Sequence, residues 1–125
     1  MNNYPVGDFL IRFKNASLAR HKQLEVNSNK KIKAVADVLE KEGYITEVKE
    51  EKGKIFLKIV YRKKEPILTQ IKLVSKPGIR IYKSADELGK VKGPSKFIVS
   101  TPKGVMSSSD AIKKRLGGEV IAEIL

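Results

Sequence analysis

The strongest constraint on the fold of this chain is the period at which its apolar residues recur. Between residues 5 and 42 the period is mainly helical, because apolar side chains return at three- and four-residue steps over two stretches. From Tyr44 to Tyr61 the period becomes two, as in a strand with one buried face. A chain that switches period in this way is expected to pack helices on one face of a sheet.

Two helices and three strands are predicted in the first half. The first helix starts near Pro5 and buries one face. That face carries Val6, Phe9, Leu10, Phe13 and Ala16. The second helix is expected over residues 30–42, with an N-cap among residues 27–29 and Gly43 as its left-handed C-cap. A short strand is expected at residues 24–26, before the second helix.

A strand pair is expected after the second helix. Thr46 and Val48 alternate with charged residues, and a turn at residues 51–54 leads into a second alternating run. That run carries Ile55, Leu57, Ile59 and Tyr61. The charged segment at residues 62–66 then breaks the pattern, so we place a subdomain boundary there.

The second half is predicted to be mostly strand. Residues 69–73 and 97–101 are expected to be extended, and Pro77-Gly78 predicts a type II turn in which glycine takes the positive φ. Residues 80–83 are expected to form a short extended segment. The chain ends on a strand at residues 119–125 that turns Val120, Ala122 and Ile124 inward.

Two short helices interrupt these strands. Ser84 opens the first with a capping box, and Gly89 is expected to close it. Ser107 caps the second, which is expected to run through Arg115 and to end at Gly117-Gly118. The predicted fold class is therefore α+β, with an α-β-α-β-β layer at residues 1–65 and a β-rich part at residues 66–125.

The charge of the chain favours a polyanionic partner. Lys and Arg number 26 against 14 Asp and Glu, which gives a net charge of +12. Residues 72–103 contain eight basic and two acidic residues, so half of the net charge lies in this segment. Because these basic residues lie within and between predicted strands, they indicate a basic surface on the folded chain rather than a basic tail.

Several classes of protein fit the sequence poorly. No cysteine is present, so disulfides and thiolate metal sites are excluded, and neither a membrane segment nor a signal pattern is visible. His21 is the only histidine, and no nucleophile elbow or phosphate loop surrounds a possible base. We expect a cytoplasmic protein that is not an enzyme and needs no cofactor or metal.

Five segments, in order, resemble one known family. They are residues 8–15, 38–45, 74–83, 100–106 and 117–119, which read DFLIRFKN, VLEKEGYI, VSKPGIRIYK, STPKGVM and GGE. The chain resembles bacterial small-subunit ribosomal protein eight over essentially its whole length. The resemblance implies two small, tightly associated subdomains, of which the β-rich one at residues 66–125 binds RNA. It also implies that the protein binds an irregular stem in the central domain of small-subunit ribosomal RNA and supports subunit assembly. It also implies neighbouring ribosomal proteins as partners and, in some members, binding of their own messenger RNA.

The resemblance also implies a contact set. The matched motif positions are Tyr82, Ser100, Thr101, Lys103, Gly104 and Glu119, to which the same motifs add Lys76, Arg80, Lys83 and Gly118. Lys96 and Lys30, the latter at a predicted helix start, are expected to contact phosphates. Two departures from the family stand out: Pro102 replaces a third hydroxyl residue, and Gly93-Pro94-Ser95-Lys96 replaces a Gly-x-Gly step.

The chemistry of this set suggests a division of labour. Short hydroxyls can donate to and accept from 2′-hydroxyls and base edges across a shallow minor groove, whereas lysines supply affinity without sequence choice. Ser100-Thr101 can also be an ordinary strand end, Tyr82 can equally cover core, and Glu119 can face solvent. The alternative function is a basic interaction protein that binds nucleic acid or an acidic partner without sequence specificity.

Overall fold

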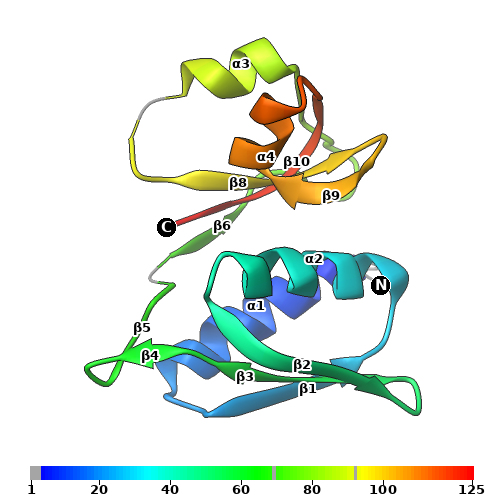
Figure 1. The fold of residues 1–125 in the computed structure, drawn as a ribbon. Coiled ribbons are helices and arrows are strands. Elements are labelled where there is room, and N and C mark those ends of the chain that lie inside the picture. Colours follow the sequence, from blue (N-terminus) through cyan, green and yellow to red (C-terminus); the bar gives the residue numbers. More distant parts are fainter. Residues whose placement is uncertain (1–3, 69, 92) are drawn as a thin grey trace. The chain divides into compact units, whose positions relative to one another are not determined.

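The computed structural model describes residues 4–68, 70–91 and 93–125. The chain divides into two compact units, which are Pro5–Thr69 and Gln70–Leu125, the latter joined by Tyr4. This division falls four residues beyond the boundary expected from the sequence. Both units combine helices with antiparallel strands (Figure 1), so the predicted α+β class is confirmed. Among the described residues, no helix is long and apolar enough to cross a membrane.

The N-terminal unit follows the predicted α-β-α-β-β order and then adds a small hairpin. Its elements are α1 (Pro5–Leu18), β1 (Gln23–Asn27), α2 (Lys30–Lys41), β2 (Ile45–Glu51), β3 (Lys54–Ile59), β4 (Tyr61–Arg62) and β5 (Glu65–Pro66). Strand β3 lies between β1 and β2 and is antiparallel to both. Helices α1 and α2 cover one face of this sheet (Figure 1). The β4–β5 hairpin was not predicted, because two-residue strands leave no period to detect.

Helix α2 begins and ends as its sequence predicts. The Asn29 side chain accepts hydrogen bonds from the backbone N–H groups of Lys31 and Ile32, which satisfies the first turn. At the other end Gly43 has φ +88°, and its N–H donates to the carbonyl of Glu40. The Tyr44 N–H also donates back, to the carbonyl of Leu39, and these two bonds define a Schellman motif.

The predicted alternation in β2 is wrong at its start. Ile45 is buried, Thr46 is exposed, and the pairing with β3 shifts between Thr46 and Lys49. Glu47 takes φ +53° at this irregularity. A β-bulge inserts one extra residue, so the inward positions are Ile45 and the half-buried Val48, three residues apart instead of two. The alternation in β3 is confirmed, since its burial alternates residue by residue.

The C-terminal unit is built on a sheet in the order β6-β10-β8-β9, with β7 also paired to β10. Its elements are β6 (Ile71–Leu73), β7 (Tyr82–Lys83), α3 (Ala85–Lys90), β8 (Lys96–Thr101), β9 (Gly104–Ser107), α4 (Ser108–Lys113) and β10 (Gly118–Ile124). The last strand is therefore central, and Val120, Ala122 and Ile124 are buried as predicted. Strand β9 was not predicted, and Thr69 lies outside the described residues.

One hydrophobic cluster joins α3 and α4 to this sheet. It consists of Leu88, Phe97, Val99, Met106, Ala111 and Val120, with Val74 and Leu116 packed against it. Both predicted N-caps are confirmed: Ser84 forms a capping box with Glu87, and Ser107 accepts from the N–H of Asp110. Hydrogen bonds from the Ser84 backbone and side chain lower the pKa of the Glu87 carboxyl. These caps fix the helix starts over the sheet.

Both predicted helix ends in this unit are wrong. Gly89 lies inside α3, which continues to Lys90. Helix α4 ends at Lys113, and Arg115 takes the left-handed position with φ +56°. Its N–H donates to the carbonyl of Ile112, and that of Leu116 donates to the carbonyl of Ala111. The helix therefore closes with a Schellman motif that uses arginine in place of glycine.

Gly117 and Gly118 serve close packing of the backbone instead. A Cβ on Gly117 would lie 2.5 Å from the carbonyl oxygen of Lys83. A Cβ on Gly118 would overlap the carbonyl oxygen of Ser100. These two glycines let the start of β10 approach β7 on one side and β8 on the other.

Candidate nucleic-acid interface

Three of the predicted contact residues form a single row across the C-terminal sheet. Glu119 pairs with Tyr82 on one side and with Ser100 on the other, and Ser100 in turn pairs with Val105. Directly paired residues of antiparallel strands point to the same face. Because neighbouring Val99 and Val120 belong to the core under α3 and α4, this row lies on the opposite face. We call Tyr82, Glu119, Ser100 and Val105 the cross-strand row.

The two hydroxyl residues of the predicted loop do not share a face. Ser100 and Thr101 are consecutive in β8, so their side chains project to opposite sides of the sheet. Thr101 is 8% exposed, and its hydroxyl donates to the carbonyl of Gly104 at 2.8 Å and accepts from the N–H of Lys103 at 3.1 Å. By contrast, the hydroxyl of half-buried Ser100 makes no hydrogen bond to any described residue. The Ser100 hydroxyl is therefore the one left for a ligand.

The turn after Thr101 accommodates Pro102, the residue that departs from the family pattern. Pro102 and Lys103 are the two turn residues between paired Thr101 and Gly104. Proline is favoured at the first position of such a turn, where its fixed φ suits the backbone. Gly104 follows with φ +120°, a backbone angle that residues with a side chain rarely adopt. This turn leaves Lys103 exposed at its tip.

Glu119 is held by an arginine, which explains a carboxylate beside a basic surface. The Arg80 guanidinium lies 3.4 Å from the Glu119 carboxylate, and its central carbon lies 4.8 Å from the centroid of the Tyr4 ring. Burial raises the pKa of the Tyr4 hydroxyl, as does the Glu119 charge, while Arg80 lowers it. The Tyr4 hydroxyl has no hydrogen-bond partner within the described part of the chain.

One residue that positions the row was missed by sequence reasoning. Ser75 is fully buried, and its hydroxyl donates to the carbonyl of Val120 at 2.7 Å and accepts from the N–H of Ile81 at 2.9 Å. The segment between β6 and β7 is thereby fastened to β10 next to Glu119. A lone serine before Lys76 carries no signal of this role, because both partners are distant in sequence.

The segment that Ser75 fastens ends in the predicted tight turn. Lys76 and Ile79 exchange backbone hydrogen bonds of 2.8 and 2.9 Å, and Gly78 between them has φ +84°. This matches the type II turn expected at Pro77-Gly78. Lys76 is exposed at this turn, and Tyr82 follows on β7 with 66% of its surface exposed.

The remaining predicted residues lie at several places. Lys83 is half-buried on β7 opposite Gly118, and Lys96 is half-buried at the start of β8 opposite Ile124. Lys30 is exposed at the first position of α2, in the N-terminal unit. Of the basic segment at residues 72–103, Lys92 lies outside the described residues. The second departure, Gly93 to Lys96, lies between α3 and β8 and ends on the first residue of β8.

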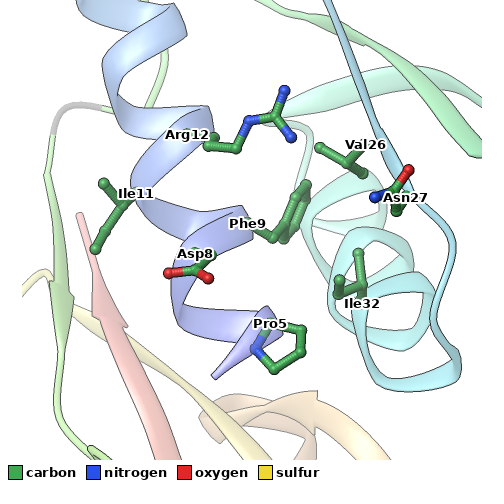
Figure 2. A pocket seen from close by; sticks show the side chains of 8 residues that line it. All are labelled: Pro5, Asp8, Phe9, Ile11, Arg12, Val26, Asn27 and Ile32. Carbon is green, nitrogen blue, oxygen red and sulfur yellow. The ribbon is translucent and has the colours of Figure 1, made fainter. Parts of the chain in front are cut away.

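The N-terminal unit has a concavity beside α1. It measures about 390 Å³ and is lined by Pro5, Asp8, Phe9, Ile11, Arg12, Val26, Asn27 and Ile32. Figure 2 shows the Phe9 ring pointing from α1 toward Val26, with the Arg12 guanidinium beside it. Arg12 donates to the carbonyl of Glu25 at 3.2 Å, which ties α1 to β1. None of these lining residues belongs to the predicted contact set, so we do not assign a ligand to this concavity.

Comparison with known proteins finds one family. A sequence profile described as Ribosomal protein S8 matches residues 4–125. Proteins named small ribosomal subunit protein uS8 are 44% identical in Caldanaerobacter subterraneus and 41% identical in Nitratidesulfovibrio vulgaris, each alignment covering 96% of both chains. A third, from Prochlorococcus marinus, is 42% identical over 98% of both chains.

Proposed function

The chain belongs to the ribosomal protein S8 family of small-subunit constituents, and we propose that the cross-strand row binds an irregular stem of small-subunit ribosomal RNA. As a structural component of the small ribosomal subunit it is not an enzyme. Its partners are ribosomal RNA and other ribosomal proteins. The resemblance inferred from the sequence motifs is thus confirmed at the level of the family.

The observation that carries the proposal is the contrast between Ser100 and Thr101. The Thr101 hydroxyl is used inside the β8–β9 turn, whereas the Ser100 hydroxyl is left for a ligand. A hydroxyl on a sheet face can both donate to and accept from a 2′-hydroxyl or a base edge in a shallow minor groove. In this proposal Ser100 makes the specific contact, and Thr101 with Gly104 shapes the turn beside it.

Tyr82 and Glu119 complete the row in different ways. Tyr82 is 66% exposed and pairs with Glu119, so its ring can stack on a base or pack against a ribose. Glu119 keeps its charge balanced by Arg80 and has a carboxylate able to accept from a base amino group. Lys76, Lys83 and Lys103 contribute phosphate contacts around the row, and Lys96 contributes one from the other end of β8. If about six phosphates are neutralised, log affinity falls with log salt at a slope of about −4 to −5.

A gel-shift titration with the full chain tests the proposal. A central-domain stem with irregular pairing is compared with a regular RNA duplex of equal length at matched salt. Ser100→Ala is expected to lower affinity for the irregular stem by about tenfold, in line with about 1–3 kcal/mol for one specific contact. Lys103→Gln is the control, because it is expected to weaken both RNAs alike and to lower the salt slope by about one.

Two outcomes would contradict the proposal. Equal affinity of the wild-type chain for both RNAs would favour a basic protein without sequence specificity. An unchanged preference after Ser100→Ala and Tyr82→Ala together would exclude the cross-strand row as the specific surface. We further propose that a stem of the same irregular form in the chain's own message would be bound by this row.

A further inference from the structure

A second group of basic residues lies at the β4–β5 hairpin of the N-terminal unit, whereas the cross-strand row belongs to the C-terminal unit. It combines the end of α1 with the hairpin and consists of Arg20, His21, Lys22, Arg62, Lys63 and Lys64. The one acid among them, Glu65, lies 3.0 Å from the Arg20 guanidinium. No carboxylate of the described residues pairs with Lys22, Arg62, Lys63 or Lys64. This end of the unit therefore carries a net positive charge that is open to a ligand.

The backbone of the hairpin is unusual for the residues it contains. Arg62 pairs with Glu65, so Lys63 and Lys64 form a two-residue turn, and their φ angles are +53° and +67°. Two positive φ angles define a type I′ turn, in which Asn-Gly is favoured. The β2–β3 turn of the same unit has the same form with Lys52 and Gly53, at φ +49° and +77°. Lysine at both positions costs stability, because each non-glycine residue there is strained by about 1 kcal/mol or more.

Neighbouring side chains hold this strained hairpin in place. One N–H group of the Arg20 guanidinium donates a hydrogen bond to the carbonyl of Lys64, and a second donates to the Glu65 carboxylate. The Tyr61 hydroxyl donates to the carbonyl of His21, which fixes the ring against the end of α1. These hydrogen bonds hold the hairpin against the end of α1, so Lys63 and Lys64 at its tip form a preorganised cationic surface.

A concavity opens at the base of the hairpin. It measures about 590 Å³ and is lined by Arg20, Lys22, Tyr61, Lys64 and Glu65. The half-buried Tyr61 ring and the aliphatic stems of the cations provide apolar wall, while the charged groups surround it. A phosphodiester with its attached ribose and base fits this chemistry, because the phosphate meets cations and the base meets an aromatic ring. A folded acidic protein would not need the ring.

We propose that this concavity and the Lys63-Lys64 tip form a second RNA-binding site, which takes a backbone phosphate and an unpaired nucleotide of the RNA. The inference rests on the proposed function, since it assigns a further contact to the same partner. The site explains why two strained lysines occupy a turn that glycine would make more stable.

The test replaces the strained lysines with the residues that the turn favours. Lys63→Asn with Lys64→Gly keeps a type I′ turn and removes two charges, so the variant is expected to unfold at a higher temperature. Lys52→Asn is the matched control, because it makes the same change at the same position of the β2–β3 turn, at the other end of β3 (Figure 1). Full-length chains are titrated against a central-domain fragment containing the irregular stem and its flanking segments, with hydroxyl-radical footprinting.

The wild-type chain and Lys52→Asn are expected to protect the stem and one further segment. The double variant is expected to protect the stem alone, to bind the fragment about tenfold more weakly and to lower the salt slope by about one to two. An unchanged footprint and affinity in the double variant would overturn the second site. A wild-type chain that leaves the stem unprotected but keeps the second footprint would instead overturn the function proposed for the cross-strand row.

Discussion

Arg80 lies between Glu119 and Tyr4, 3.4 Å from the Glu119 carboxylate and with its central carbon 4.8 Å from the centroid of the Tyr4 ring. The Glu119 side chain is 13% exposed and that of Arg80 is 39% exposed, so the pair is only partly screened by solvent. In the proposed complex the Glu119 carboxylate is a negative charge in a row that meets a polyanion. We infer that the Glu119 charge lowers the affinity of the row for nucleic acids other than the irregular stem.

Glu119→Gln tests this restraint. The substitution keeps the shape of the side chain, removes the charge and frees the Arg80 guanidinium for a phosphate. We expect affinity for regular duplex DNA to rise several-fold and the salt slope to steepen by about one, because one more phosphate contact becomes available. The ratio of affinities for the irregular stem and the duplex, measured by competition gel shift, should fall. A duplex affinity that does not change would contradict this role of Glu119.

Tyr4→Phe tests the electrostatics beneath Arg80. The pKa of the Tyr4 hydroxyl is raised in the folded chain, so the folded state keeps this proton to a higher pH than the unfolded state, whose tyrosines titrate near 10. The resulting stability is present below about pH 10 and is lost as pH rises from there through the folded pKa. Tyr4→Phe should remove this part of the stability loss at alkaline pH. At pH 7 it should leave the free energy of unfolding unchanged or raise it by about 1 kcal/mol, because the buried hydroxyl has no described partner.

Urea unfolding at pH 7, 9 and 11 measures this effect. Tyr82→Phe is the matched control, since the Tyr82 ring is largely exposed. The control should lose as much stability on the way to pH 11 as the wild-type chain. If Tyr4→Phe and the wild-type chain lost stability in parallel, the burial of the Tyr4 hydroxyl would have no energetic consequence.

We expect Thr101 to support RNA binding by stabilising the β8–β9 turn and not by contacting RNA directly. Thr101→Val removes both hydrogen bonds of the hydroxyl, so we expect the free energy of unfolding to fall by about 1–2 kcal/mol. Thr101→Ser keeps the hydroxyl and should bind the irregular stem within about twofold of the wild-type chain. Thermal unfolding and gel shifts on both variants check this. Weak RNA binding by a stable Thr101→Ser chain would show that the threonine methyl group itself contacts RNA.

The parts of the fold that were predictable depend on signals close together in the sequence. The helix face of α1, the N-caps at Asn29, Ser84 and Ser107, and the turn at Gly78 each involve residues within a few positions of one another. The family motifs also supplied residues that lie on neighbouring strands. Tyr82, Ser100 and Glu119 come from three separate motifs, and the sheet brings them into one row.

The errors arose where distant segments decide the role of a residue. Gly117 and Gly118 resemble a helix end, but their lack of a Cβ matters only because Lys83 and Ser100 approach them across the sheet. Arg115 ends the helix instead, at a position where residue preferences favour glycine. The internal hydrogen bond of the Thr101 hydroxyl could not be foreseen for the same reason, since its acceptor at Gly104 belongs to a hairpin that was predicted only as a turn.

Gly118→Ala should be among the most damaging small substitutions in the C-terminal unit. The new Cβ would overlap the carbonyl oxygen of Ser100 and lie 2.8 Å from its carbonyl carbon, so β10 and β8 would have to separate. We expect the free energy of unfolding to fall by about 3 kcal/mol or more, as for other backbone clashes in packed positions. Gly89→Ala is the control, because a Cβ there meets nothing within 4 Å and the position lies inside α3. Alanine should stabilise that helix by about 0.5–1 kcal/mol. Chemical denaturation of both variants measures the contrast, and a Gly118→Ala chain as stable as the wild type would show that β10 does not need this close approach to β8.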